Sequence, residues 1–322
     1  MASFWEKLPK PFFALAPLED VTDAAFRRLI AEFSSPAVPR VMYTEFTSAD
    51  GLLLADEAGK KKLLKKLLFS EAERPIVAQL FTASPERMEA GARSCAELGF
   101  DGFDINMGCP DRAVEKSGCG ASLMKHPTEA RELIRAAKRG FGGPVSVKTR
   151  IGYNTDELDT WLPELLAEEP AAIAIHARTR KEMSDVPAHW DAIARAVEIR
   201  DGMKSKALII GNGDVRDLAD GREKAKESGC DGVMLGRAVF GNPWLFSGRA
   251  DAPSPRERLD ALARHLELFD ELLGGTAHYA TMKKHFKSYI SGWDGAKELR
   301  SKLMDTKSIE ETLGMLKRGS CA

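Results

Sequence analysis

Apolar residues gather in eight short runs along the first three quarters of the chain, and a stretch with helical periodicity follows each run. The runs cover residues 12–18, 40–46, 75–81, 102–108, 144–150, 171–178, 206–214 and 232–238. Most of them are continuously apolar, which is typical of parallel strands that are covered on both faces. Eight such units within the roughly 250 residues usual for the fold predict a (β/α)8 TIM barrel, and a doubly wound sheet is the alternative.

Residues that favour helix N-termini separate these runs from the helical stretches. They lie at 22–23, 84–86, 127–129 and 155–157, where Thr, Asp, Ser, Pro and Glu precede the periodic segments. Side-chain oxygens of such residues accept hydrogen bonds from the free N–H groups of the first turn, and proline fits the first helical position. We therefore assign these residues to helix capping and give them no catalytic role.

The pattern changes near residue 250. Pro253 and Pro255 lie in a stretch typical of a linker, and only helical periodicities follow it, over 256–273, 278–293, 296–304 and 308–317. We expect two domains: a barrel over residues 1–250 and a small domain of three or four helices over residues 251–322.

The composition excludes several classes of protein. The chain has 322 residues, is 43% hydrophobic and 30% charged, and carries a formal net charge of −1, so it can bury a large core. No run approaches the ~18 apolar residues of a membrane span, and the first residues lack the apolar core of a signal peptide, so we expect a cytoplasmic protein. The five cysteines form no CxxC pair and the six histidines show no metal-ligand spacing. This argues against a disulfide framework, a zinc site or an iron–sulfur cluster.

Polar residues mark the C-terminal ends of the predicted strands, where barrel enzymes carry their chemistry. They are Gln79, Asn106, Cys109, Lys148, Arg150, His176, Arg178, Asn212, Asp214 and Arg237. A lysine within an apolar strand is costly to bury without a partner, so we expect an anionic or strongly polar ligand to face Lys148.

Cys109 follows an apolar strand directly and lies between Gly108 and Pro110. Glycine allows the backbone to approach a bound molecule closely, and proline restricts φ just after the cysteine. The pattern therefore predicts a thiol that is held against a ligand. A cysteine that only caps a buried strand is the alternative, because cysteine is common in protein cores.

Glycines occur in the loops after the seventh and the eighth predicted strand, at 211–213 and 235–237. In TIM barrels these two loops commonly bind phosphate through backbone amides, and a guanidinium group such as that of Arg237 binds phosphate bidentately. Tight turns would also explain either glycine pair alone. Both pairs together, at the right strands, predict a cofactor that carries a phosphate group.

The motifs resemble those of the tRNA-dihydrouridine synthases, flavin enzymes that reduce uridine in transfer RNA. The matching segments are 16–18, 21–23, 44–45, 77–81, 104–110, 118–123, 147–150, 176–179, 211–214 and 235–238. Asn-x-Gly-Cys-Pro at 106–110 followed by Gly-x-Gly-Ala at 118–121 is the most specific of them. The resemblance runs from about residue 12 to 250, and segments 282–285 and 295–300 extend it into the helical part.

The resemblance implies FMN as the cofactor and NADPH or NADH as its reductant. It places the FMN phosphate at Asn212, Gly213, Asp214, Gly236 and Arg237, and the flavin ring against Pro17, Leu18, Glu19, Gln79, Lys148 and His176. A positive charge near N1 and O2 stabilises an anionic reduced flavin. No Gly-x-Gly-x-x-Gly fingerprint is present, which fits a nicotinamide that reduces the flavin and leaves.

The resemblance also implies that Cys109 is the catalytic acid. Hydride passes from flavin N5 to C6 of uracil, and the acid protonates C5 from the opposite face. A thiol with a pKa near ~8.5 is mostly protonated at neutral pH and still acidic enough for this step. Asn106 would orient the uracil or the flavin, and Cys119 is expected to be a small buried filler.

Transfer RNA is the partner that the resemblance implies, and the target base must leave its stack to enter the barrel. Residues 278–307 hold seven Lys/Arg against three Asp/Glu, and we expect Lys283, Lys284 and Lys287 to contact RNA. Arg150 and Arg178 would meet the substrate in the barrel mouth. The lysine-rich run at 60–66 is a second candidate, although a solvated helix face has the same pattern. We expect no membrane, no metal and a monomer.

Some departures from the family pattern concern the position of the substrate. Asp20 and Thr82 replace usual glycines, and residues 181–189 lack the usual Gln-x-Tyr-x-Gly character. Two other classes of function stay open. One is a flavin barrel that reduces a free pyrimidine or an enone. The other is a non-catalytic RNA-binding barrel or a phosphate-binding lyase barrel with Lys148 as Schiff base.

Overall fold

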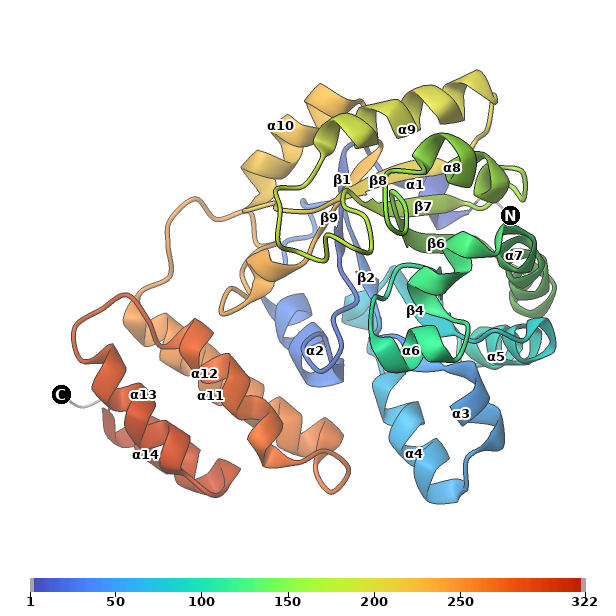
Figure 1. Cartoon of the computed structure of the whole chain (residues 1–322). Coiled ribbons are helices and arrows are strands. Elements are labelled where there is room, and N and C mark those ends of the chain that lie inside the picture. The colour runs from blue at the N-terminus through green and yellow to red at the C-terminus, as the bar shows by residue number, and fades with distance from the viewer. Residues whose placement is uncertain (1–2, 320–322) are drawn as a thin grey trace.

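The computed structural model describes residues 3–319 and contains a closed parallel barrel (Figure 1). Its strands are β1 (Phe12–Leu15), β2 (Arg40–Tyr43), β3 (Thr47–Ser48), β4 (Ile76–Phe81), β5 (Gly102–Asn106), β6 (Val145–Arg150), β7 (Ala172–His176), β8 (Leu208–Asn212) and β9 (Gly232–Leu235). Their order is β2-β1-β9-β8-β7-β6-β5-β4-β3, and β2 also pairs with β4, which closes the sheet. The predicted TIM barrel is confirmed.

The second barrel strand was predicted as one run over 40–46, but the structure divides it into β2 and β3. The chain leaves the sheet after Tyr43 and returns at Thr47, so β2 pairs with the start of β4 and β3 pairs with its end. The other predicted strands are present at the expected places, with ends up to three residues shorter because the last residues turn into the loops of the barrel mouth.

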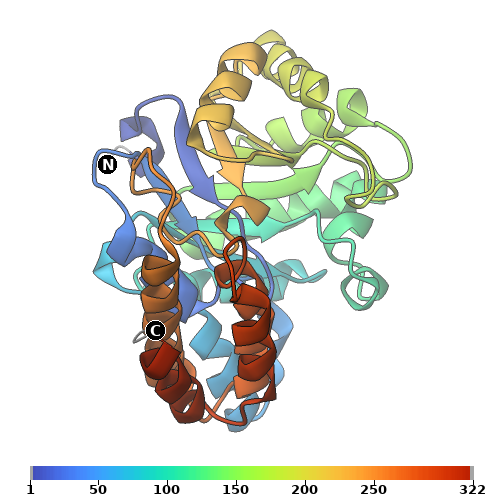
Figure 2. The same cartoon turned by 90° about the vertical axis from the view of Figure 1, so that its left-hand side faces the viewer.

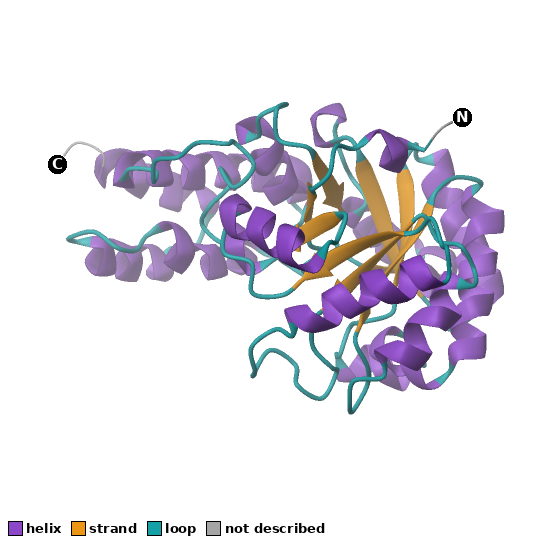
Figure 3. Ribbon diagram, turned by 90° about the horizontal axis from the view of Figure 1, so that it is seen from above, coloured by secondary structure: helices purple, strands orange, loops and turns teal. Residues whose placement is uncertain are grey.

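Helices cover the outside of the barrel (Figure 3). They are α2 (Ala24–Phe33), α3 (Ala49–Leu54), α4 (Glu57–Lys66), α5 (Pro85–Glu97), α6 (Arg112–Lys116), α7 (Pro127–Phe141), α8 (Leu158–Leu166), α9 (Trp190–Gly202) and α10 (Leu218–Ser228), with 3₁₀ turns at Glu71–Glu73, Gly120–Lys125 and Arg237–Val239. Asp23 and Ser84 cap α2 and α5 as predicted. Before α8, Asp156 accepts a hydrogen bond from Leu158 N at 3.0 Å, as predicted, whereas the N-cap residue Glu157 accepts one from Tyr153 N at 2.8 Å.

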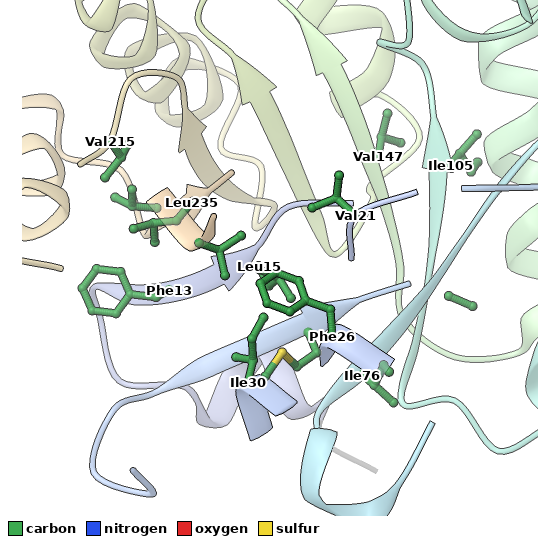
Figure 4. Close-up of a cluster of buried hydrophobic side chains, with 14 of the residues drawn as sticks. Phe13, Leu15, Val21, Phe26, Ile30, Ile76, Ile105, Val147, Val215 and Leu235 are labelled. Carbon is green, nitrogen blue, oxygen red and sulfur yellow. The ribbon is translucent and has the colours of Figure 1, made fainter. Parts of the chain in front are cut away.

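Two apolar clusters follow from the alternation of side chains along the strands. The outer cluster packs strand residues such as Phe13, Leu15 and Leu235 against helix residues such as Phe26 and Ile30 (Figure 4). The inner cluster fills the base of the barrel with Trp5 of α1 (Phe4–Lys7), Phe12, Ala14, Val41, Tyr43, Val77, Ala174, Ile210 and Met234. The inner parity continues to the polar residues at the strand ends, which therefore face the barrel interior.

The helical part projects from one side of the barrel (Figures 1 and 2). It comprises α11 (Pro255–Leu273), a 3₁₀ turn at Tyr279–Met282, α12 (Lys283–Tyr289), α13 (Ala296–Asp305) and α14 (Ile309–Gly319), so the predicted helix over 278–293 is split and ends earlier. It joins the barrel through α2: Arg264 forms a bidentate ion pair with Glu32, and the His265 ring stacks on Phe26 with centroids 4.9 Å apart. None of the described helices is long and apolar enough to cross a membrane.

Candidate active site

A cavity of about 500 Å³ opens at the C-terminal ends of the strands. Its lining includes every site residue that the sequence placed in the barrel, namely Pro17, Leu18, Glu19, Gln79, Asn106, Cys109, Lys148, Arg150, His176, Arg178, Asn212, Gly213, Asp214, Gly236 and Arg237. Seven of the strands, β1 and β4 to β9, contribute to this set directly or through the loop that follows. The volume is in the usual range for a cofactor or drug-sized ligand.

The turn that carries Cys109 is held from several sides. The Asn106 side-chain oxygen accepts hydrogen bonds from Gly108 N at 3.1 Å and Cys109 N at 2.9 Å. Arg150 Nε donates to the Gly108 carbonyl at 2.8 Å, and Ala121 N donates to the Cys109 carbonyl at 2.9 Å. The thiol is therefore presented to the cavity in a defined position, as the Gly-Cys-Pro sequence predicted.

Burial raises the pKa of the Cys109 thiol, although the nearby Lys148 and Arg150 charges oppose the increase. The thiol is therefore protonated at neutral pH. Cys119 lies outside the cavity lining and is 1% exposed, with its thiol 3.5 Å from the Ser117 carbonyl. Cys95 and Cys230 are also buried, and Cys321 lies outside the described residues.

Lys148 is a half-buried cation, and no protein group among the described residues contacts its charge directly. In the described part of the chain, no hydrogen bond or ion pair involves its ammonium group, and burial lowers its pKa to about 8, with Asp104 opposing the decrease. At neutral pH the group is still mostly charged. The ligand expected to face Lys148 stays a prediction, and the half-buried ammonium group has no protein partner that would take its place.

His176 is held neutral beside this cation. Burial lowers its pKa to about 2, and Arg150 and Lys148 add to the decrease. Arg178 Nη1 lies 3.1 Å from His176 Nε2, so the guanidinium donates and Nε2 accepts. The ring proton is then assigned to Nδ1.

The loops after β8 and β9 form a cradle of glycine amides and arginines. Within the described residues, no hydrogen bond uses the N–H groups of Gly213 or Gly236. Gly213 has φ 134°, and a Cβ there would lie 2.7 Å from Ala188 Cβ, so only glycine fits. Free amides beside arginines suit an anion such as phosphate.

Asp214 occupies this cradle in a way that the sequence did not predict. Its carboxylate forms ion pairs with both Arg178 and Arg237, and the Arg178 hydrogen bond lowers its pKa. The Arg178 side chain is 2% exposed and the Arg237 side chain is 63% exposed. Asp214 therefore fixes two guanidinium groups, one buried and one at the rim.

Arg150 and Arg178 were expected to contact the substrate. Both line the cavity, but both are buried and largely occupied by protein atoms: Arg150 also donates to the Thr179 and Met183 carbonyls, and Arg178 Nε donates to the Val186 carbonyl at 2.6 Å. They order the mouth loops. Whether they also contact RNA stays a prediction.

The three predicted lysines of α12 lie in different environments. Lys284 Nζ is 3.9 Å from Asp20 Oδ2, at the loop between β1 and α2 that lines the cavity. Lys287 is exposed, whereas Lys283 Nζ donates to the Met304 carbonyl at 2.6 Å and so binds the end of α13. Only Lys284 and Lys287 are therefore disposed toward a partner.

The lysine-rich helix α4 reaches the same loop. Lys66 forms an ion pair with Glu19, and Lys65 Nζ donates to the Leu272 carbonyl at the end of α11 at 2.6 Å. Two cationic segments more than 200 residues apart in the sequence thus meet at the cavity rim. The sequence offered the run at 60–66 only as a second candidate beside a solvated helix face, because this convergence appears only in the folded chain.

The departure at Asp20 lies in a backbone conformation that the structure defines. Asp20 has φ 55°, the left-handed conformation that favours glycine, and its N–H donates to Glu45 Oε1 at 2.6 Å. Glu45 is buried, which raises its pKa to about 7 although Lys66 opposes the increase. Among the described residues, Glu19, Asp20 and Glu45 have carboxylate oxygens within 4.8 Å of one another. In the variant segment 181–189, Ser184 lines the cavity.

Comparisons with known proteins cover nearly the whole chain. The family described as "Dihydrouridine synthase (Dus)" matches residues 14–320. A probable tRNA-dihydrouridine synthase 2 from Bacillus subtilis (strain 168) is 44% identical over 316 residues, 98% of this chain and 95% of the relative. A probable tRNA-dihydrouridine synthase from Staphylococcus aureus (strain COL) is 42% identical over 316 residues, 98% of this chain and 94% of the relative.

Two solved structures share the fold at low identity. Histamine dehydrogenase from Rhizobium sp. 4-9 superimposes with a TM-score of 0.53 at 12% identity, over 81% of this chain and 49% of that one. A morphinone reductase variant in complex with tetrahydroNAD gives a TM-score of 0.50 at 14% identity, over 74% of this chain and 85% of that one. At this identity the likeness supports the barrel fold alone.

Proposed function

The chain belongs to the dihydrouridine synthase family, and on that premise we propose how its barrel carries out the flavin-dependent reduction of uridine to 5,6-dihydrouridine in transfer RNA. The observation that carries the proposal is the position of Cys109, a protonated thiol fixed by Asn106 and Arg150 in the same cavity as Lys148. A reductase of this kind needs a flavin and a nicotinamide that reduces it.

We propose FMN as the flavin, because the residues present fit its phosphate and its ring. The free amides of Gly213 and Gly236 and the arginines that Asp214 holds would bind the phosphate. Gln79, Lys148, His176, Pro17, Leu18 and Glu19 would contact the ring, and Asn212 would belong to the phosphate end. When bound, the reduced flavin supplies a hydride, and we propose NADPH as its source of electrons, with NADH as the alternative.

Lys148 and His176 have different electrostatic roles. Lys148 keeps a positive charge at neutral pH, which favours negative charge that develops on the ring or on the uracil. His176 is neutral, so it offers an Nδ1–H donor without adding a second positive charge. The pair thus supplies one full charge and one directed hydrogen bond.

Cys109 is proposed as the acid that protonates C5 of the uracil after C6 has received the hydride. Its raised pKa keeps the proton on sulfur until an adjacent carbanion takes it. The thiolate that forms would be stabilised by the positive charges of Lys148 and Arg150. Asn106 holds the turn, so its role is to position Cys109.

Transfer RNA would lie across the rim between α4 and α12. Lys284 and Lys287 from the helical part, and Lys60, Lys61 and Lys62 from α4, are the side chains proposed to contact phosphates. Extruding the uridine from its stack would bring the base into the cavity between them. The relatives are bacterial proteins. We therefore include in the proposal that the protein acts in the cytoplasm, where transfer RNA is found.

The test is a substrate comparison with purified enzyme and NADPH. Transfer RNA isolated from cells that lack this protein should gain dihydrouridine, measured by mass spectrometry of nucleosides, while free uridine and a simple enone should stay unchanged. Reduction of free uridine at a comparable rate would favour a small-molecule reductase instead.

A further inference from the structure

Asp104 is a buried carboxyl group inside the barrel that the reaction described above leaves without a task. It lies in β5 two residues before Asn106, and its side chain has no exposed surface. The register of β5 and β6 places Asp104 opposite Ser146 and Asn106 opposite Lys148. Asp104 is therefore one layer beneath the polar floor of the cavity.

A chain of hydrogen bonds leads from Asp104 to the Cys109 turn, and the backbone fixes its direction. Because Gly108 N and Cys109 N can only donate, the Asn106 atom that faces them must be the oxygen. The Asn106 amide nitrogen then donates to Gln79 Oε1 at 3.0 Å, and Gln79 Nε2 donates to Asp104 Oδ2 at 2.7 Å. The chain thus ends on an acceptor that only Asp104 supplies.

The other carboxylate oxygen of Asp104 accepts from Ser146 Oγ at 2.5 Å. Ser146 Oγ also lies 3.3 Å from the Phe103 carbonyl, so the hydroxyl has a second acceptor available. Both oxygens of the carboxylate are therefore occupied by neutral donors. The negative charge itself has no ion-pair partner in direct contact among the described residues.

Lys148 is the cation whose positive charge Asp104 can balance. It lies two residues beyond Ser146 on the same inner face of β6. Asp104 is the only carboxylate among the groups that raise the pKa of Lys148, and Lys148 lowers the pKa of Asp104, which burial brings to about 6. The two groups are thus a separated pair of opposite charges, of which Asp104 is buried and Lys148 is half-buried at the cavity.

We propose that Asp104 is the positioning residue of this site, which orients the Gln79 and Asn106 amides behind the Cys109 turn and provides the counter-charge of the Lys148 ammonium group. Asp104 touches neither substrate nor cofactor in this role. The importance of the Cys109 turn for catalysis rests on the proposed function. The orientation of the Gln79 and Asn106 amides and the counter-charge of Lys148 do not depend on it.

Two substitutions separate the charge from the acceptor. In Asp104→Asn, the side-chain oxygen still accepts from Gln79, and the new amide donates to Ser146 Oγ, whose hydroxyl turns to Phe103; only the charge is lost. In Asp104→Leu, both the negative charge and the hydrogen-bond acceptor for Gln79 are lost. Asp111→Asn is the matched control, because Asp111 is an exposed carboxylate near Cys109 that does not contribute to the pKa of Lys148.

The charge is tested by titrating the full-length protein labelled with ¹³Cε-lysine, with the Lys148 resonance assigned from its loss in Lys148→Met. Asp104→Asn should lower the pKa of Lys148 by about one unit, the usual effect of removing a nearby opposite charge. Asp111→Asn should leave it unchanged. An unaltered Lys148 titration in Asp104→Asn would overturn the counter-charge.

The acceptor is tested by amide hydrogen exchange of Gly108 and Cys109, whose N–H groups end the chain. Exchange should be about fivefold faster in Asp104→Leu, the effect of one neutral hydrogen bond, and near the wild-type rate in Asp104→Asn. If Asp104→Leu does not fold, Gln79→Leu interrupts the same series of hydrogen bonds at the next residue and should give the same increase in the exchange rate. Unchanged exchange would overturn the orienting role. Neither the titration nor the exchange measurement involves turnover. A negative result in either one can therefore be told apart from failure of the proposed reaction.

Discussion

Replacing Arg237 by alanine tests the phosphate end of the cofactor site. A charge-assisted hydrogen bond contributes about 1.5–3 kcal/mol. The Arg237 side chain is 63% exposed and shares its guanidinium with Asp214, so solvent screening places its contribution at the lower end. About 1.5 kcal/mol corresponds to a roughly tenfold weaker affinity for FMN.

The assay is an equilibrium titration of flavin-free protein, followed by quenching of flavin fluorescence. Riboflavin, which has the ring without the phosphate, is titrated in parallel. Arg237→Ala should weaken FMN binding about tenfold and leave riboflavin binding unchanged, since the contact is with the phosphate. Arg216→Ala is the control: it removes a nearby arginine that pairs with Asp220 and lies outside the cavity lining.

An equal loss of affinity for FMN and riboflavin in Arg237→Ala would refute the reasoning, because the effect would then come from the ring end or from the fold. The same conclusion would follow if Arg216→Ala weakened FMN binding as much as Arg237→Ala. Circular dichroism of each variant keeps a folding defect apart from a lost contact.

Two further predictions concern the helical part. Lys284→Ala combined with Lys287→Ala should reduce the slope of log affinity for transfer RNA against log salt by roughly 0.7–0.9 per lost phosphate contact, whereas Lys283→Ala should leave that slope unchanged because Lys283 binds the Met304 carbonyl. An unaltered slope in the double variant would return α12 to a solvated face. Burial lowers the pKa of His265 and of His285, the latter to about 3, so the unfolded chain binds more protons than the folded one below pH ~6.5 and stability falls as the pH falls. His285→Phe should remove about 1.4 kcal/mol per pH unit from that loss between pH 6 and 4, measured by urea unfolding, and an unchanged slope would contradict a neutral buried His285.

The barrel and the membership of its site were predictable because they depend on short-range patterns. Continuous apolar runs indicate strands that are buried on both faces, and the closed parallel barrel brings the C-terminal ends of those strands to one mouth. Gln79, Lys148 and His176 could therefore be assigned to one cavity from their positions at the strand ends, and the structure places all three in its lining.

The partners of these side chains were not predictable, because they depend on long-range geometry. Asp214 could be placed beside a phosphate, but its two arginines come from different strands, and the buried pairing with Arg178 appears only in the fold. Lys283 and Lys287 share the helical spacing, yet the end of α13 occupies one of them. Asp104 had a usable signal, since it has the same inward parity as Asn106 and is the only charged residue within β5.

Single-turnover formation of dihydrouridine in transfer RNA, by enzyme that has been reduced beforehand, tests the role of Cys109 most directly. Cys109→Ala should keep its flavin, its reduction by NADPH and its affinity for transfer RNA, and should form dihydrouridine about 10²–10⁴-fold more slowly, the usual contribution of a positioned acid. Cys119→Ala, which changes a buried thiol outside the cavity lining, should react at the wild-type rate. Normal turnover by Cys109→Ala would contradict the account, and slow turnover by Cys119→Ala in its place would assign the acid to the other cysteine.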